Sequence, residues 1–240
     1  MQEVVALTKK KKQEFARLPL FEFLANKKIH PRQRLIFSPI LAPLALGLSD
    51  LNKYVLRESS SNNKVQEFVN RHTYKEGYYW HWCLENLEKL GFNQSMSYGD
   101  LRLLWGEETK KTRSLCSELE RLAFQASPIQ KLVLAEVLQG TATVFFDSVL
   151  RVATEIQEIS RKEYVCFDGG CVLLDNHRLL NTPEMQQVLS EIEVDDREWQ
   201  QALELAEKVF DLFTEAMNEL QGLARTNSCN TVLQLELLVC

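Results

Sequence analysis

The segment that decides the fold runs from His72 to Gly91 and reads HTYKEGYYWHWCLENLEKLG. It holds two histidines, three glutamates, three tyrosines and two tryptophans, in a chain that is otherwise rich in leucine. The polar break 59–63 before it supplies an N-cap, and a glycine at position 91 is well placed to end a helix. The sequence therefore predicts one helix over about Lys64–Leu90.

Spacing of three and four residues places a polar set on one face of that helix. The set consists of His72, Lys75, Glu76, Tyr79, Cys83 and Asn86. His81 cannot join it, because it lies about 140° round the helix from Glu76. If this face looks inward, its charges need pairing or a metal ion, since unpaired buried charges are costly. The other interpretation is a half-exposed polar stripe from Lys75 to Asn86.

The composition is that of an all-α protein. The 240 residues are 45% apolar and 25% charged, and only 9 glycines and 6 prolines interrupt a chain rich in helix-forming residues. There is no internal repeat and no convincing linker. We therefore expect a single domain over residues 1–240, with residues 1–12 and 225–240 as peripheral tails.

Charge and cysteine use narrow the classes of function. The net charge is −5 and the basic residues form no continuous face, which disfavours nucleic-acid binding. The run Lys9–Lys12 indicates a solvated helix start, with contact to phosphate or a membrane surface as the alternative. Six cysteines without C-x-x-C spacing and no signal peptide predict reduced thiols in the cytoplasm. The longest apolar run, near Ile40–Leu48, is too short to span a bilayer, so no membrane association is expected.

Apolar periodicity and proline positions predict about seven helices packed as one bundle. The other predicted helices cover Gln13–Lys27, Pro31–Glu58 (bent at Pro39 and Pro43), Thr109–Gln125, Pro128–Ile159 and 195–224, with a further start at Thr182–Pro183. The least helical part is Lys162–Leu174, a short helix follows near Val172–Leu180, and Thr231–Cys240 is expected to be a strand or an extended segment.

Two further segments offer polar partners for His72. They supply Glu136, Gln139, His177, Asn181 and Glu184. Glu136 and Gln139 stand out because the helix around them is apolar. Glu184 follows a proline, which separates it from the helix of His177. Each residue alone is a weak ligand signal, since a single histidine is more often a satisfied core or surface residue.

The segment 72–91 resembles the heme-oxygenase-like superfamily, and most closely its CADD/PqqC/TenA branch. Members often show H-x2-E-D-x2-H-W-x-W-x-L-x-D-L-x-x-L-G. The same frame here holds His72, Lys75-Glu76, Tyr79-Trp80, Trp82, Leu84, Asn86-Leu87 and Leu90-Gly91. The resemblance covers residues 15–220 and includes Leu51–Arg57 (LNKYVLR), Ala135–Phe146 (AEVLQGTATVFF) and the spacing His177-x3-Asn181-x2-Glu184.

The resemblance implies a heme-oxygenase-like bundle of about seven helices with a central pocket. In metal-dependent members, carboxylates and histidines there bind two irons that activate O2. This chain departs from that pattern at Lys75, Tyr79 and Gln139, and in the last element at Asn181 and Glu184. Two divalent ions need several carboxylates, so we expect the di-iron site to be lost and the pocket to be retained. A single iron held by His72, Glu76, Glu136 and His177 is the alternative.

Three hypotheses of function follow. In the first, the pocket binds a small organic molecule without a cofactor, with His72, Lys75 and Tyr79 at its polar end and Glu76, Glu136, Gln139, His177 and Asn181 around it. In the second, the protein is an oxidoreductase, either mono-iron or cofactor-free like PqqC, in which a buried Lys75 acts as a base or forms a Schiff base. In the third, the protein is an interaction module. A homodimer is expected, since related proteins commonly form one.

Overall fold

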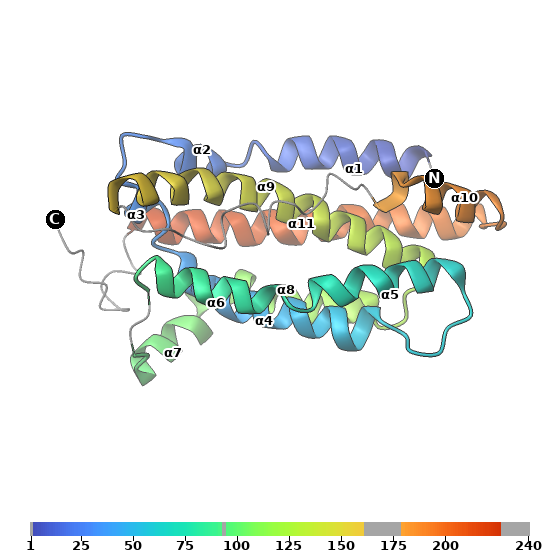
Figure 1. Cartoon of the computed structure of the whole chain (residues 1–240), viewed down its shortest axis with the longest axis horizontal. Helices are drawn as coiled ribbons and strands as arrows, with labels where there is room; N and C mark the ends of the chain where they lie inside the picture. Colours follow the sequence, from blue (N-terminus) through green and yellow to red (C-terminus); the bar gives the residue numbers. More distant parts are fainter. Residues whose placement is uncertain (1, 93–94, 161–178, 227–240) are drawn as a thin grey trace.

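The two longest helices, α9 (Pro128–Ser160) and α11 (Asp196–Thr226), lie side by side and form the centre of the molecule (Figure 1). Hydrogen bonds of Ser127 with Glu198 and of Gln130 with Gln201 join their N-terminal ends, so the two helices run in the same direction. Both begin and end close to the predicted positions. This computed structural model describes residues 2–92, 95–160 and 179–226, and within them all regular structure is helical.

The N-terminal residues differ from the expected peripheral tail. Helix α1 spans Gln2–Phe15, lies along α9 and α11, and is followed by α2 (Pro19–Ala25) (Figure 1). Val4 and Thr8, one helical turn apart, are buried on the side of α1 that faces the core. The buried side was missed in the sequence because the same helix carries a run of lysines, of which Lys9 and Lys10 are exposed.

The predicted helix Pro31–Glu58 consists of four pieces. They are α3 (Pro31–Arg34), a 3-10 turn (Ser38–Ile40), α4 (Leu41–Asp50) and a π-helical segment (Leu51–Leu56). The break falls before Pro39, as expected from the missing N–H of proline and the restriction on the residue before it. Pro43 is accommodated because it lies in the first turn of α4.

The predicted helix Lys64–Leu90 is also interrupted. It divides into α5 (Lys64–Glu76) and α6 (Tyr79–Lys89), with Gly77 and Tyr78 between them. The Gly77 carbonyl accepts a hydrogen bond from Ser49 Oγ at 2.7 Å, which takes the place of a helical partner. Asn63 caps the start, and Gly91 has a φ of 86° just after the end, where glycine is favoured. Both predicted ends are therefore confirmed, whereas the predicted continuity is wrong.

The remaining described elements complete an all-α bundle, which confirms the predicted fold class. They are α7 (Tyr98–Trp105), a 3-10 turn (Glu107–Thr109), α8 (Lys110–Ala123), a 3-10 turn (Leu179–Asn181) and α10 (Pro183–Ser190). Helix α8 runs antiparallel to α11, because Lys111 at its start contacts Glu215 and Glu219 near the other helix's end. The predictions for Lys162–Leu174 and Thr231–Cys240, and most of that for Val172–Leu180, lie outside the described residues.

Two helical stretches, Pro31–Leu56 and Pro128–Ile159, have the length and apolar composition of a membrane span. Half of each apolar window is buried inside the protein. Core helices of folded proteins meet the same criterion, so length and apolar composition do not distinguish a core helix from a membrane span.

Candidate functional site

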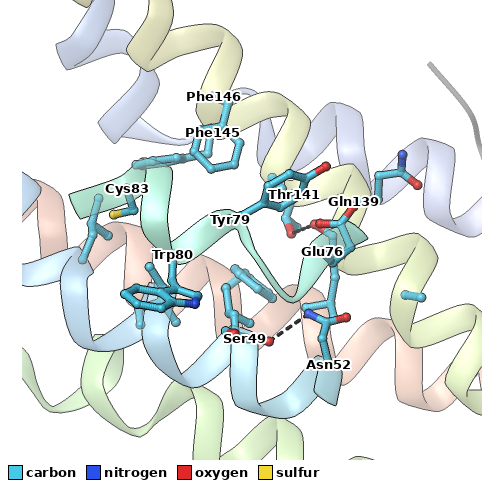
Figure 2. Close-up of a pocket in the computed structure, with 18 of the residues that line it drawn as sticks. Ser49, Asn52, Glu76, Tyr79, Trp80, Cys83, Gln139, Thr141, Phe145 and Phe146 are labelled. Carbon is cyan, nitrogen blue, oxygen red and sulfur yellow. Dashed lines mark hydrogen bonds between the residues drawn. The ribbon is translucent and has the colours of Figure 1, made fainter. Parts of the chain in front are cut away.

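A cavity of about 160 Å³ lies between α4, α5, α6 and α9, with residues of α1 and α11 closing it (Figure 2). Most of its wall is apolar. The apolar lining residues are Phe15, Leu41, Leu44, Ala45, Leu48, Trp80, Ala135, Leu138, Ala142, Phe145, Phe146, Phe213 and Met217. A wall of this kind excludes water and favours an apolar guest, while a few polar groups orient it.

The polar lining residues come from three parts of the chain. They are Ser49 and Asn52 near the α4 end, His72, Glu76, Tyr79 and Cys83 from α5 and α6, and Gln139 and Thr141 from α9. Some of their hydrogen-bonding capacity is used internally: Asn52 Nδ2 donates to Leu48 O at 2.8 Å, and Thr141 Oγ1 donates to the backbone of α9. Figure 2 shows Glu76, Tyr79 and Gln139 on the same side of the cavity.

The pair His72 and Glu76 is set by helical geometry, because residues four apart share a face of α5. His72 Nε2 lies 3.7 Å from Glu76 Oε1, and both side chains are largely buried. Burial, and to a smaller extent the charge of Lys75, lowers the pKa of His72 to about 4. Burial raises the pKa of Glu76 to about 7, against smaller opposing effects of a hydrogen bond with Tyr79 and of Lys75. Between these two values both groups are neutral, so the contact is not an ion pair.

The structure separates two other candidates from the cavity. Lys75 is exposed and does not line it, although the predicted continuous face included this residue. Glu136 is buried but does not line the cavity either, and its Oε2 accepts a hydrogen bond from Leu180 N at 3.2 Å. His177 and the side chain of Asn181 lie outside the described residues.

Three polar lining residues were missed among the sequence candidates: Ser49, Asn52 and Thr141. Asn52 belongs to LNKYVLR, a segment that the resemblance singled out, so that signal was available. Ser49 and Asn52 reach the cavity from the junction of α4 with a π-helical segment. Apolar periodicity assumes 3.6 residues per turn and does not predict a π-helix.

The described residues do not supply the two-iron centre that the superfamily resemblance implies. Within the described part of the chain, no three His, Cys, Asp or Glu side chains gather in a way that could hold a metal ion. Of the four residues considered for a single iron, His72 and Glu76 line the cavity, Glu136 does not, and His177 lies outside the described residues. The other frame positions hold an exposed lysine, a phenol and an amide, which do not neutralise a divalent ion.

Comparisons with known proteins bear on the fold alone. No protein-family model matches the sequence, and no curated protein is significantly similar to it. A solved structure from Shewanella denitrificans OS217, a domain of unknown function with a heme oxygenase-like fold, superposes with a TM-score of 0.57. The match covers 95% of this chain and 92% of that one at 14% identity. The chain therefore has a heme-oxygenase-like fold, and at this identity no activity is transferred with it.

Proposed function

We propose that this heme-oxygenase-like protein binds a small organic molecule in the cavity between α4, α5, α6 and α9, without a di-iron centre. The observation that carries the proposal is the cavity itself, about 160 Å³ with an apolar wall and polar groups on one side. An apolar cavity of about 150 Å³ in another protein admits benzene. A ring-sized molecule with a short polar substituent is therefore the expected guest.

The polar groups of the site differ from those expected from the sequence, since Lys75 and Glu136 do not line the cavity, whereas Ser49, Asn52 and Thr141 do. Lys75 lies outside, so His72, Glu76, Tyr79 and Gln139 form the polar side of the cavity. A neutral imidazole and an amide each offer a donor and an acceptor, and the phenol of Tyr79 offers both in one group. Such a set orients a polar substituent by hydrogen bonds.

A matched pair of variants on α4 tests the proposal. Ala45 lines the cavity, whereas Ala42, one turn earlier and similarly half-buried, does not. Binding of benzyl alcohol, followed by NMR chemical-shift titration, should be lost in Ala45→Leu, because the added carbons fill the cavity, and retained in Ala42→Leu. Equal binding in both variants, or no binding to the wild-type protein, would contradict the proposal.

An oxidoreductase is the second candidate, now without Lys75 as its base. Glu76 favours it, because its pKa of about 7 suits a group that exchanges a proton near neutral pH. O2 consumption with a bound substrate that is lost in Glu76→Gln would support this role. Unchanged turnover in that variant would remove Glu76 from it.

An interaction module is the third candidate, and one element favours it. None of the residues of α6 is buried, although the helix includes Trp80 and Trp82. Trp82 is half-buried and Leu84 is exposed, and a partly exposed apolar surface of this kind is typical of protein contacts, of which the expected homodimer is one. Light scattering of the wild-type protein and Trp82→Glu should show a dimer only in the former if α6 forms this contact.

A further inference from the structure

The described lining of the cavity carries negative charge and no positive charge. Of the residues that line it in the described part of the chain, Glu76 is the only carboxylate, and none is a lysine or arginine. A basic residue next to Glu76 on α5, Lys75, is exposed and does not line the cavity, so its charge acts on the site only as the minor effect described above. His72 is neutral near pH 7 and adds no positive charge. An anionic guest would therefore meet a carboxylate and no cation inside the cavity.

A cationic guest meets the opposite situation. Only 18% of the Glu76 side chain is exposed, and a buried carboxylate needs a positive partner to offset its desolvation. The rings of Tyr79, Trp80 and Phe145 line the same cavity, and aromatic faces attract ammonium groups. The carboxylate and the rings thus favour the same type of head group.

The size of the cavity limits what is attached to that head group. At about 160 Å³, with Leu44, Leu48, Phe146 and Met217 in its wall, it matches one aromatic ring or a short branched alkyl group. We infer that the cavity takes a small primary amine with a ring-sized apolar group, whose ammonium pairs with the Glu76 carboxylate and whose apolar part lies against α4 and α9. This inference rests on the proposed function and specifies its ligand class.

Three probes of equal size and different charge test the ligand class: benzylamine, benzyl alcohol and benzoate. We expect benzylamine to bind roughly tenfold more tightly than benzyl alcohol at pH 7.5, as a charge-assisted hydrogen bond provides. Benzoate should show no measurable binding. The titrations are done by calorimetry in phosphate buffer with 0.15 M salt, which screens non-specific attraction of a cation to the negative protein.

Two variants locate the charge effect. Glu76→Gln keeps the shape of the side chain and removes its charge, so benzylamine should bind this variant no more tightly than benzyl alcohol does. Glu85→Gln, on the half-exposed side of α6, removes one negative charge outside the cavity and should leave both affinities unchanged.

The outcomes separate the two proposals. Suppose that benzyl alcohol binds the wild-type protein but not Ala45→Leu, and that benzylamine binds no more tightly than benzyl alcohol. The cavity is then a binding site and the amine inference is wrong. A preference for benzylamine that persists in Glu76→Gln also overturns the inference. If none of the three probes binds the wild-type protein, the proposed function fails together with the ligand class.

Discussion

His72 and Glu76 make opposite contributions to the pH dependence of stability. The pKa of His72 falls from 6.5 to about 4 on folding, so its contribution is fully present above pH 6.5 and is lost as pH falls through 4. The pKa of Glu76 rises from 4.5 to about 7, so its contribution is fully present below pH 4.5 and is lost as pH rises through 7. Between pH 4.5 and 6.5 the free energy of unfolding rises with pH because of His72 and falls with pH because of Glu76, so the two effects largely offset.

Replacing either residue alone should reveal the pH dependence of stability that the other one causes. Glu76→Gln removes the loss of stability that Glu76 causes as pH rises. The free energy of unfolding of this variant, compared with that of wild type, should therefore increase by on the order of 3 kcal/mol between pH 4.5 and 7. In His72→Gln it should lose a similar amount, relative to wild type, as pH rises from 4 to 6.5. Urea unfolding curves between pH 4 and 8 measure both. Stability profiles of Glu76→Gln and wild type that run parallel would show that Glu76 is not buried as described.

Two helical glycines should respond in opposite directions to the same substitution. A Cβ at Gly47 would lie 2.7 Å from Cys116 Sγ and 2.8 Å from its Cβ, whereas at Gly222 nothing lies within 4 Å. Gly47→Ala should therefore destabilise the protein by about 1–3 kcal/mol, because α4 and α8 must move apart. Gly222→Ala should stabilise it by up to about 1 kcal/mol through helix propensity. Chemical denaturation checks both, and a stabilised Gly47→Ala would mean that the two helices are not in close contact.

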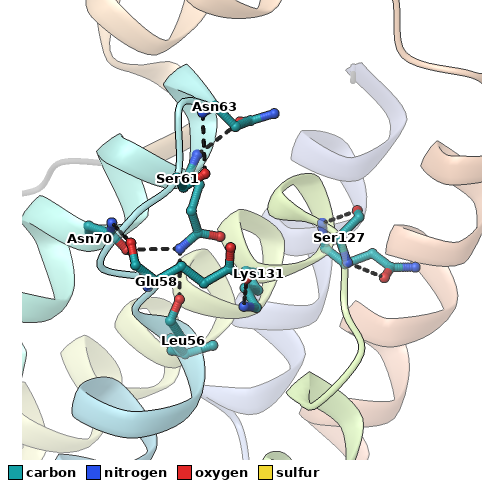
Figure 3. Close-up of polar contacts among 9 residues, drawn as sticks. Leu56, Glu58, Ser61, Asn63, Asn70, Ser127 and Lys131 are labelled. Atoms are coloured by element: carbon teal, nitrogen blue, oxygen red, sulfur yellow. Dashed lines mark hydrogen bonds and ion pairs between the residues drawn. The ribbon is translucent and has the colours of Figure 1, made fainter.

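At the scale of elements, the segment after the π-helix is tied to both α5 and α9 (Figure 3). Gln66 Nε2 donates to Leu56 O at 2.8 Å, and Asn70 Nδ2 donates to Glu58 O at 2.7 Å. Lys131, 4% exposed, pairs with Glu58 Oε1 at 2.5 Å. These contacts supply partners for carbonyls that the end of the helix leaves free and for a buried ammonium.

Substitutions at Glu58 and at Lys131 should lower stability by unequal amounts. Glu58→Ala leaves a buried ammonium without its carboxylate and should cost about 1–3 kcal/mol, a value reduced by the half-exposed position of Glu58. Lys131→Met replaces the buried cation by an apolar chain of similar length and should cost less. The exposed pair Glu107–Lys110 is the control, since Glu107→Ala should change stability by less than about 0.5 kcal/mol. Thermal and urea unfolding at pH 7 measure all three. Equal losses in Glu58→Ala and Glu107→Ala would contradict the role of the buried lysine.

The sequence predicted the ends of elements better than their continuity. Helix ends were recognised at the polar break 59–63, at Thr182, at residue 195 and at Gly91, because capping residues act locally and leave a local signature. The interruption at Gly77 was missed, since it depends on Ser49, which is distant in sequence. A helical wheel also grouped Lys75 with His72 and Glu76, although it lies about 100° round α5 from Glu76 and is exposed. His72, Glu76, Tyr79 and Gln139 were predicted and line the cavity, whereas the enclosing apolar wall required the tertiary structure.

At the scale of the whole molecule, α1 connects the N-terminus to the core and to the cavity. Phe15 at its end packs edge-on against Phe21, with ring centroids 5.3 Å apart, and against Phe210 and Phe213 of α11 at 6.4 and 6.5 Å. Phe15 and Phe213 also line the cavity. The first helix therefore contributes to the shape of the candidate binding site as well as to stability.

A charge on the inner side of α1 should consequently affect both stability and binding. Val4 is completely buried against the bundle, so Val4→Glu should lower the free energy of unfolding by about 3 kcal/mol or more and weaken benzyl alcohol binding. Ala6, exposed on the same helix, is the control, and Ala6→Glu should change stability by less than about 0.5 kcal/mol. Urea unfolding and ligand titration measure the two effects. If Val4→Glu were as stable as Ala6→Glu, residues 2–12 would be a peripheral tail after all, and Phe15 alone would remain to link this end of the chain to the cavity.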